Sequence, residues 1–107
     1  MNILKKCNAI VIGLGKIGMI NGFDSKRMQP ASHVAAILKN PNINLIGVCD
    51  INTEFTDIFK KKNPEVKNVF NSLEDLLEKI ISTNIEIDIF SIATPENAHF
   101  KIIKLMI

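Results

Sequence analysis

The stretch Ala9-Ile10-Val11-Ile12-Gly13-Leu14-Gly15-Lys16-Ile17-Gly18 decides the fold. A β-branched apolar run leads directly into Gly-x-Gly-x-x-Gly, the arrangement in which a strand turns into a helix around the phosphates of a dinucleotide. Gly13 would permit the tight turn, Gly15 would let the pyrophosphate approach the backbone, and Gly18 would let the helix pack close to the strand. Glycine-rich turns without a ligand share this motif, so an ordinary strand-to-helix turn is the alternative. The candidate phosphate-binding residues are Gly13, Gly15, Lys16, Ile17 and Gly18.

Length and composition indicate one small, soluble, globular domain. The chain has 107 residues, of which 47% are hydrophobic and 22% charged. A net charge of +2 does not favour nucleic acid as a partner. No apolar run approaches the roughly 20 residues of a membrane span, and the N-terminus lacks the apolar stretch of a secretory signal. These features predict a cytoplasmic protein without a membrane partner, and they leave its oligomeric state open, a homo-oligomer included.

The two cysteines favour the same compartment. Cys7 would open the first strand and Cys49 would lie near the end of the second, so the two thiols would lie too far apart to form a disulfide. We expect two buried, reduced thiols that pack as small apolar groups. No cluster of Cys and His residues suggests a metal site.

Strand and helix patterns alternate along the chain. Ser32, Asn52 or Thr53, and Ser72 are candidate N-caps because each precedes an amphipathic stretch. A polar segment at 21–32, containing Gly and Pro, would form an inserted loop that interrupts the first crossover. The strands are expected over 7–13, 45–49, 69–70 and 87–93, and the helices over 33–39, 53–62, 73–81 and 96–107. The apolar side of the first helix is expected to be buried, namely Val34, Ala35, Ile37 and Leu38. In the third helix the apolar residues recur at helical spacing, namely Leu76, Leu77, Ile80 and Ile81.

This alternation predicts an α/β fold of the Rossmann type. Right-handed crossovers would give a parallel sheet of about four strands in the order 3-2-1-4, flanked by helices. Ligands of such sheets bind beyond the carboxyl ends of the strands, so the loops at 13–18, 50–52 and 93–95 would converge on one crevice. Because the last strand would be an exposed edge, we expect residues 1–107 to be an incomplete dinucleotide-binding domain without its later strands.

Asp50 would follow the second strand, where a carboxylate can accept hydrogen bonds from the hydroxyls of the adenosine ribose. It would repel a 2′-phosphate, and no Arg or Lys follows it at 51–53, so we expect NAD rather than NADP as the cofactor. The spacing from the glycines exceeds the usual value of roughly 20 residues, and the insertion accounts for the excess. With its neighbour Ile51, Asp50 completes the adenosine side of the candidate site. An Asp that only begins a turn is the alternative.

The full set of motifs resembles the N-terminal cofactor domain of the Gfo/Idh/MocA oxidoreductases. The resemblance spans nearly the whole chain and rests on Gly13-Leu14-Gly15-Lys16-Ile17-Gly18, His33-Val34-Ala35-Ala36-Ile37, Gly47-Val48-Cys49-Asp50, Ile92-Ala93-Thr94-Pro95, and His99. It implies NAD(P)-linked hydride transfer on a sugar-like or polyol substrate. By this resemblance Ala93, Thr94 and Pro95 would line the nicotinamide-ribose side, and His99 is a further cofactor candidate. His33 is instead expected to pack or to cap its helix.

Two features depart from the family pattern. Glu96 follows Pro95 where the family often has Asn, and the 21–32 insertion is shared by only part of the family. The family's catalytic Glu-Lys-Pro segment has no match, because the only Glu-Lys pair, Glu78-Lys79, precedes Ile80. We therefore expect this chain to bind cofactor without catalysing, as part of an oxidoreductase whose C-terminal substrate domain is missing here. The alternatives are a stand-alone nucleotide-sensing or interaction module, and a cofactor domain like that of homoserine dehydrogenase or dihydrodipicolinate reductase.

Overall fold

Within the part of the chain that the structure describes, four short strands rich in β-branched residues pair in parallel to form one sheet. The computed structural model describes residues 6–16 and 18–93. The strands are β1 (Cys7–Ile12), β2 (Ile43–Cys49), β3 (Asn68–Phe70) and β4 (Ile89–Ile92). Their order in the sheet is β3-β2-β1-β4, and all three pairings are parallel. The predicted fold class and strand order are therefore confirmed, while the expected 87–93 strand is shorter at both ends.

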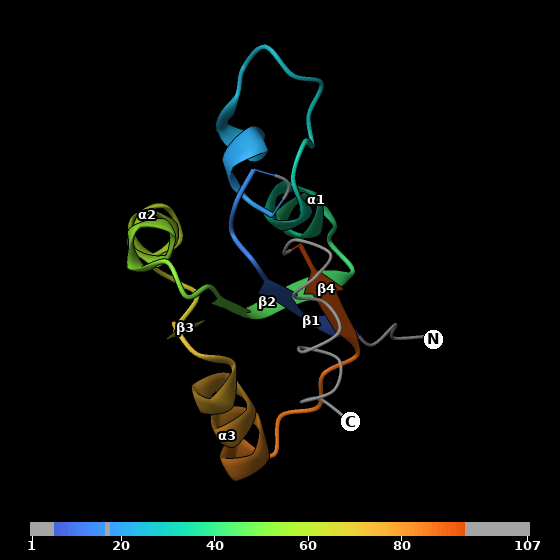
Figure 1. The fold of residues 1–107 in the computed structure, drawn as a ribbon. Coiled ribbons are helices and arrows are strands. Elements are labelled where there is room, and N and C mark those ends of the chain that lie inside the picture. Colours follow the sequence, from blue (N-terminus) through green and yellow to red (C-terminus); the bar gives the residue numbers. More distant parts are fainter. Residues whose placement is uncertain (1–5, 17, 94–107) are drawn as a thin grey trace, which may run out of the picture.

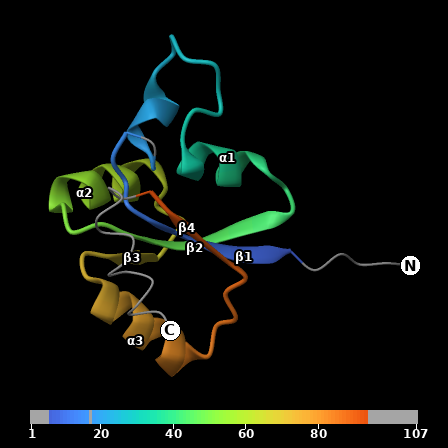
Figure 2. The ribbon, with the colours of Figure 1, turned by 45° about the vertical axis from the view of Figure 1, so that its right-hand side comes forward.

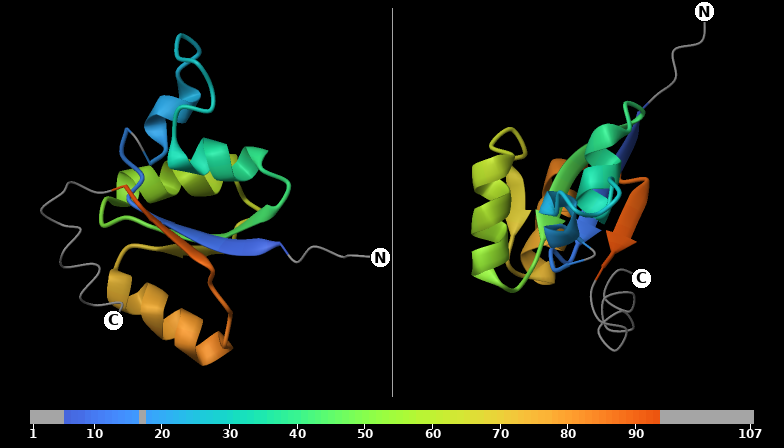
Figure 3. Two further views of the ribbon diagram at one scale, coloured as in Figure 1. Left: turned by 90° about the vertical axis from the view of Figure 1, so that its right-hand side faces the viewer. Right: turned by 90° about the horizontal axis from the view of Figure 1, so that it is seen from above.

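Helices cover both faces of this sheet (Figure 1). They are α1 (His33–Lys39), α2 (Thr53–Lys62) and α3 (Leu73–Thr83), with a short 3₁₀ helix, η1 (Ile20–Phe23). Figure 2 and the left view of Figure 3 show α1 and α2 on one face and α3 on the other. The expected helix over 96–107 lies outside the described residues.

Alternating side chains of β1 divide the core into two layers, because successive residues of a strand point to opposite faces. Ala9 and Val11 pack with α1 and α2, where Phe59 is fully buried. Ile10 and Ile12 pack on the other face, where Leu76 of α3 is fully buried. The continuous apolar run in β1 therefore reflects burial on both faces, as expected for the centre of a parallel sheet.

The predicted helix caps are confirmed. The Ser32 side chain accepts a hydrogen bond from the Ala35 amide at the start of α1. The Ser72 side chain accepts one from the Asp75 amide at the start of α3. For α2 the cap is Asn52, whose side chain accepts a hydrogen bond from the Glu54 amide. Each cap satisfies one of the N–H groups that a helix leaves unpaired at its first turn.

Several expectations about burial and element bounds are wrong. Leu38 is 48% exposed and Ile81 is 79% exposed, so the buried side of each helix is narrower than its apolar stripe. Cys7 is exposed because it opens β1 at the margin of the sheet, whereas Cys49 is buried as expected. The segment 21–32 is not a loop throughout, since residues 21–23 belong to η1. The crossover is nevertheless interrupted between η1 and α1, as predicted.

Candidate functional site

The turn after β1 has the backbone geometry that its glycines allow. Gly13 has a φ of 101°, in the left-handed region that side-chain-bearing residues rarely adopt. Its amide donates to the Cys49 carbonyl at 2.8 Å, which ties the turn to the end of β2. The amides of Met19 and Ile20 then both donate to the Gly15 carbonyl, at 2.8 and 3.0 Å. The chain therefore coils into a short helical turn directly after Gly15.

Gly18 and Gly15 have opposite surroundings in this turn. A Cβ on Gly18 would lie 1.9 Å from the Gly13 carbonyl oxygen, so the turn packs too closely on the strand end for any side chain. A Cβ on Gly15 would meet nothing within 4 Å. The amides of Gly15 and Lys16 donate to no acceptor among the described residues. Among the described residues, this part of the turn thus combines two unpaired N–H groups with open space at the Cβ position of Gly15, which are features of a phosphate-binding turn.

The Asp50 carboxylate points at the glycine turn. Its Oδ2 accepts a hydrogen bond from the Leu14 amide at 2.6 Å, and its Oδ1 accepts one from the Asn52 amide at 2.8 Å. Asp50 follows β2 directly, so the end of one strand and the turn after its neighbour meet at this side chain. A carboxylate has about four lone-pair sites, and the two amides leave acceptor positions for hydroxyls of a ligand.

Ile51, the next residue, is 86% exposed. Its apolar side chain therefore lies at the surface directly beside the carboxylate. A large apolar side chain at the surface of a polar loop can pack against the flat face of a ligand ring. Ile51 and Asp50 thus offer an apolar and a charged contact from one loop.

The end of β4 also reaches this region. The Ala93 amide donates to the Ile12 carbonyl at 2.8 Å, so Ala93 lies beside the start of the glycine turn. Of the predicted site residues, Gly13, Gly15, Gly18, Asp50 and Ala93 come from adjacent strand ends, with Lys16 and Ile51 exposed beside them. The other four predicted residues, Ile17, Thr94, Pro95 and His99, lie outside the described residues.

His33 packs within the fold, as expected. Its Nδ1 lies 2.5 Å from the Ser91 hydroxyl, which joins the first turn of α1 to β4. Sequence reasoning missed Asn71, which directly follows β3. Its side-chain amide donates to the Asp50 carbonyl at 2.8 Å. The signal was present, because Asn71 is a polar residue at the carboxyl end of a predicted strand, as Asp50 is.

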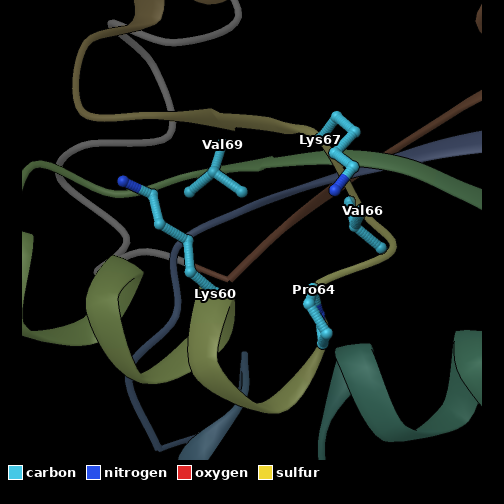
Figure 4. Close-up of a pocket in the computed structure, with 5 residues that line it drawn as sticks. All are labelled: Lys60, Pro64, Val66, Lys67 and Val69. Atoms are coloured by element: carbon cyan, nitrogen blue, oxygen red, sulfur yellow. The ribbon is translucent and has the colours of Figure 1, made fainter.

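A separate cavity of about 380 Å³ lies between α2 and β3 (Figure 4). It is lined by Lys60, Pro64, Val66, Lys67 and Val69. Val66 and Lys67 precede β3, so the cavity lies toward the amino end of that strand and includes none of the predicted cofactor residues. In the part of the chain that the structure describes, no group of three or more His, Cys, Asp or Glu residues could hold a metal ion. None of the described helices has the length and apolar character needed to cross a membrane.

Cys49 lies directly before Asp50 but is a poor nucleophile. Burial raises the pKa of its thiol from 9.0 to about 11, with smaller contributions from the charges of Asp50, Glu74 and Asp75. At pH 8 we expect a thiol reagent to label Cys49 about a hundredfold more slowly than a thiol whose pKa is 9.0, because that shift lowers the thiolate fraction by this factor. Burial of Cys49 also makes its labelling slower than that of the exposed Cys7. Cys7→Ser and Cys49→Ser variants would assign the two rates. Equally fast labelling of both thiols in the native protein would contradict the burial of Cys49.

Comparison with known proteins identifies one family. The GFO_IDH_MocA model, described as an oxidoreductase family with an NAD-binding Rossmann fold, matches residues 7–107. No curated protein and no solved structure gives a significant match. The matched region covers nearly the whole chain and includes each of the four described strands.

Proposed function

We propose that this chain, which belongs to the Gfo/Idh/MocA family of oxidoreductases, binds NAD beyond the carboxyl ends of its strands. The family assignment establishes an NAD(P)-binding Rossmann domain. The preference for NAD is supported by one observation above all: the Asp50 carboxylate is held toward the glycine turn by the Leu14 amide at 2.6 Å. A carboxylate in this position favours a ribose with two free hydroxyls and disfavours a 2′-phosphate.

Each end of the cofactor has candidate partners in this chain. The amides of Gly15 and Lys16 would donate to the pyrophosphate, and the partial positive charge of the short turn would favour its negative charge. Asp50 would accept hydrogen bonds from the adenosine ribose, with Ile51 against the adenine ring. Ala93 would lie at the nicotinamide end, because the hydrogen bond from its amide to the Ile12 carbonyl holds it beside the glycine turn. Thr94, Pro95 and His99 are proposed at the same end from the family resemblance.

The proposed reaction is hydride transfer to or from a sugar-like or polyol substrate, as in the family. Bound NAD supplies the hydride acceptor, and this chain's own residues bind and orient it. We assign no catalytic residue within the 107 residues, because the Glu-Lys-Pro segment of the family is not present. The sequence also contains no Tyr, so it has no Tyr–Lys pair of the kind that short-chain dehydrogenases use. The proposed contribution of this domain is therefore to orient the nicotinamide toward a substrate that is bound by groups outside these 107 residues.

Isothermal titration calorimetry with NAD and NADP tests the proposal. We expect NAD to bind at least about tenfold more tightly than NADP, since one or two hydrogen bonds to a charged group amount to this factor. The Asp50→Ala substitution should weaken NAD binding by about tenfold and remove most of the discrimination against NADP.

Asp88→Ala is a matched control at the opposite end of the sheet. The Asp88 carboxylate also accepts a backbone hydrogen bond, from the Asn8 amide at 2.8 Å, but it lies before β4 rather than after a strand. This variant should bind NAD as the unsubstituted protein does. Equal affinities for NAD and NADP would contradict the role of Asp50, and a lack of NAD binding by the folded chain would contradict the proposed function.

A further inference from the structure

We propose that Asn71 is a positioning residue for the cofactor site, because its side chain fixes the backbone from which the Asp50 carboxylate projects. The consequence for NAD binding rests on the proposed function, whereas the positioning itself does not. Asn71 directly follows β3 and is joined to Asp50 by a hydrogen bond from its Nδ2 to the Asp50 carbonyl at 2.8 Å.

The orientation of this amide is determined by its partners. Its Nδ2 also donates to the Thr56 hydroxyl at 2.9 Å. The Asp50 carbonyl can only accept, so the NH₂ end of the Asn71 side chain must face it. Both N–H bonds of the amide group are thereby used, one on the end of β2 and one on α2.

Both backbone polar groups of Asp50, its amide and its carbonyl, are hydrogen-bonded at the end of β3. The Asp50 amide donates to the Phe70 carbonyl at 3.0 Å, and the Asp50 carbonyl accepts from Asn71. The β2–β3 backbone ladder ends at the Cys49–Phe70 pair. The Asn71 side chain therefore extends the pairing by one residue, to the position that carries the carboxylate.

The Thr56 hydroxyl provides a rigid support for this contact. Thr56 is fully buried, and its Oγ1 donates to the Thr53 carbonyl at 3.0 Å while it accepts from Asn71. A buried hydroxyl that both donates and accepts has little freedom to move, because either broken bond would leave a polar group unpaired. Asn71 thus couples the first turn of α2 to the end of β2.

These contacts restrict the orientation of the Asp50 side chain. With its backbone amide and carbonyl both bound, only two side-chain torsions remain, and the Leu14 and Asn52 amides hold the two carboxylate oxygens. Asn71 acts through this arrangement and needs no contact with a nucleotide. A binding group that is already held in place loses less conformational entropy when the ligand binds, and the affinity is therefore higher.

Hydrogen exchange at the Leu14 amide reports whether the Asp50 carboxylate stays in place, and it can be measured in the absence of nucleotide. In Asn71→Asp, which keeps the size of the side chain, a carboxylate replaces the donor and faces the Asp50 carbonyl. We expect hydrogen exchange at the Leu14 amide, measured by NMR, to accelerate by about fivefold or more, the effect of one lost hydrogen bond. Exchange at the Val11 amide, in the centre of β1, is the internal reference. Equal acceleration at Val11 and Leu14 would show that the whole domain has been destabilised.

Asn68→Asp, at the start of β3, is the matched control. The Asn68 Nδ2 also donates to a β2 carbonyl, that of Ile46, at 3.1 Å, but four residues before Asp50. This variant should leave exchange at Leu14 unchanged relative to Val11. Unchanged exchange at Leu14 in Asn71→Asp, or equal acceleration in both variants, would overturn the positioning role.

A double-mutant cycle tests the consequence for binding. Asn71→Asp should weaken NAD binding by about fivefold in the unsubstituted protein and have no effect in the Asp50→Ala background. An equal loss in both backgrounds would show that Asn71 does not act through Asp50. If the folded protein binds no NAD, the proposed function fails, while exchange at Leu14 still decides whether Asn71 positions the carboxylate.

Discussion

Gly18→Ala is expected to lower the free energy of unfolding by about 3 kcal/mol or more, the upper range for forcing extra volume into a packed site. The added Cβ would lie 1.9 Å from the Gly13 carbonyl oxygen, 2.8 Å from its carbon and 3.2 Å from the Leu14 Cα. All three neighbours are backbone atoms, so no side-chain rotation can relieve the contact. The Gly18 carbonyl also accepts from the Val34 amide, so a shift of the turn would displace α1 as well. Urea denaturation followed by circular dichroism measures the loss.

Gly15→Ala is the matched control for this prediction. It makes the same substitution three residues away, where a Cβ meets nothing within 4 Å and φ is not in the left-handed region. We expect its stability to stay within about 1 kcal/mol of the unsubstituted protein. Similar stability of Gly18→Ala and Gly15→Ala would contradict the close packing of the turn on β1.

The sheet order was predictable because it follows from local signals and general topology. An apolar run, a glycine turn and a capped helix repeat along the chain, and right-handed parallel crossovers leave few ways to arrange them. Ser32 and Ser72 were identified as caps for the same reason, since an N-cap bonds within three residues of itself. The family assignment confirms the resemblance that these motifs indicated.

Burial at the edges of helices was not predictable from periodicity. The spacing of Leu38 and Ile81 places them on the apolar side of their helices, but both are exposed. Periodicity gives the direction of the buried face, whereas the width of that face depends on how much sheet lies beneath the helix. In α1, only Val34 and Ile37 are buried.

The hydrogen bonds of the candidate site were only partly predictable. The rule that strand ends converge was enough to bring Asp50 to the glycine turn, and the Leu14 contact agrees with it. The Asn71 contacts depend on where β2 and β3 stop relative to each other, and they join residues 15 and 21 positions apart. No local pattern encodes that register, so the sequence alone did not reveal this support.

Gly15→Val is expected to weaken NAD binding by roughly thirtyfold or more while leaving the fold intact. The proposed pyrophosphate position lies over Gly15, where an added Cβ would meet nothing within 4 Å and the Gly15 and Lys16 amides donate to no acceptor among the described residues. An isopropyl group in that space would hold the phosphates away from the N–H groups, and losing one or two charge-assisted hydrogen bonds amounts to a factor of this size. Calorimetry with NAD measures the loss, and circular dichroism checks the fold.

The same variant separates the two halves of the proposed site. Adenosine, which has the ribose hydroxyls but no phosphate, should bind Gly15→Val as it binds the unsubstituted protein, because Asp50 and Ile51 are unchanged. Asp50→Ala should show the reverse pattern, with weaker adenosine binding and an unaltered contribution from the phosphates. If Gly15→Val bound NAD normally, the phosphates could not lie against this turn. The glycines would then be needed only for the close packing of the turn on β1, as at Gly18.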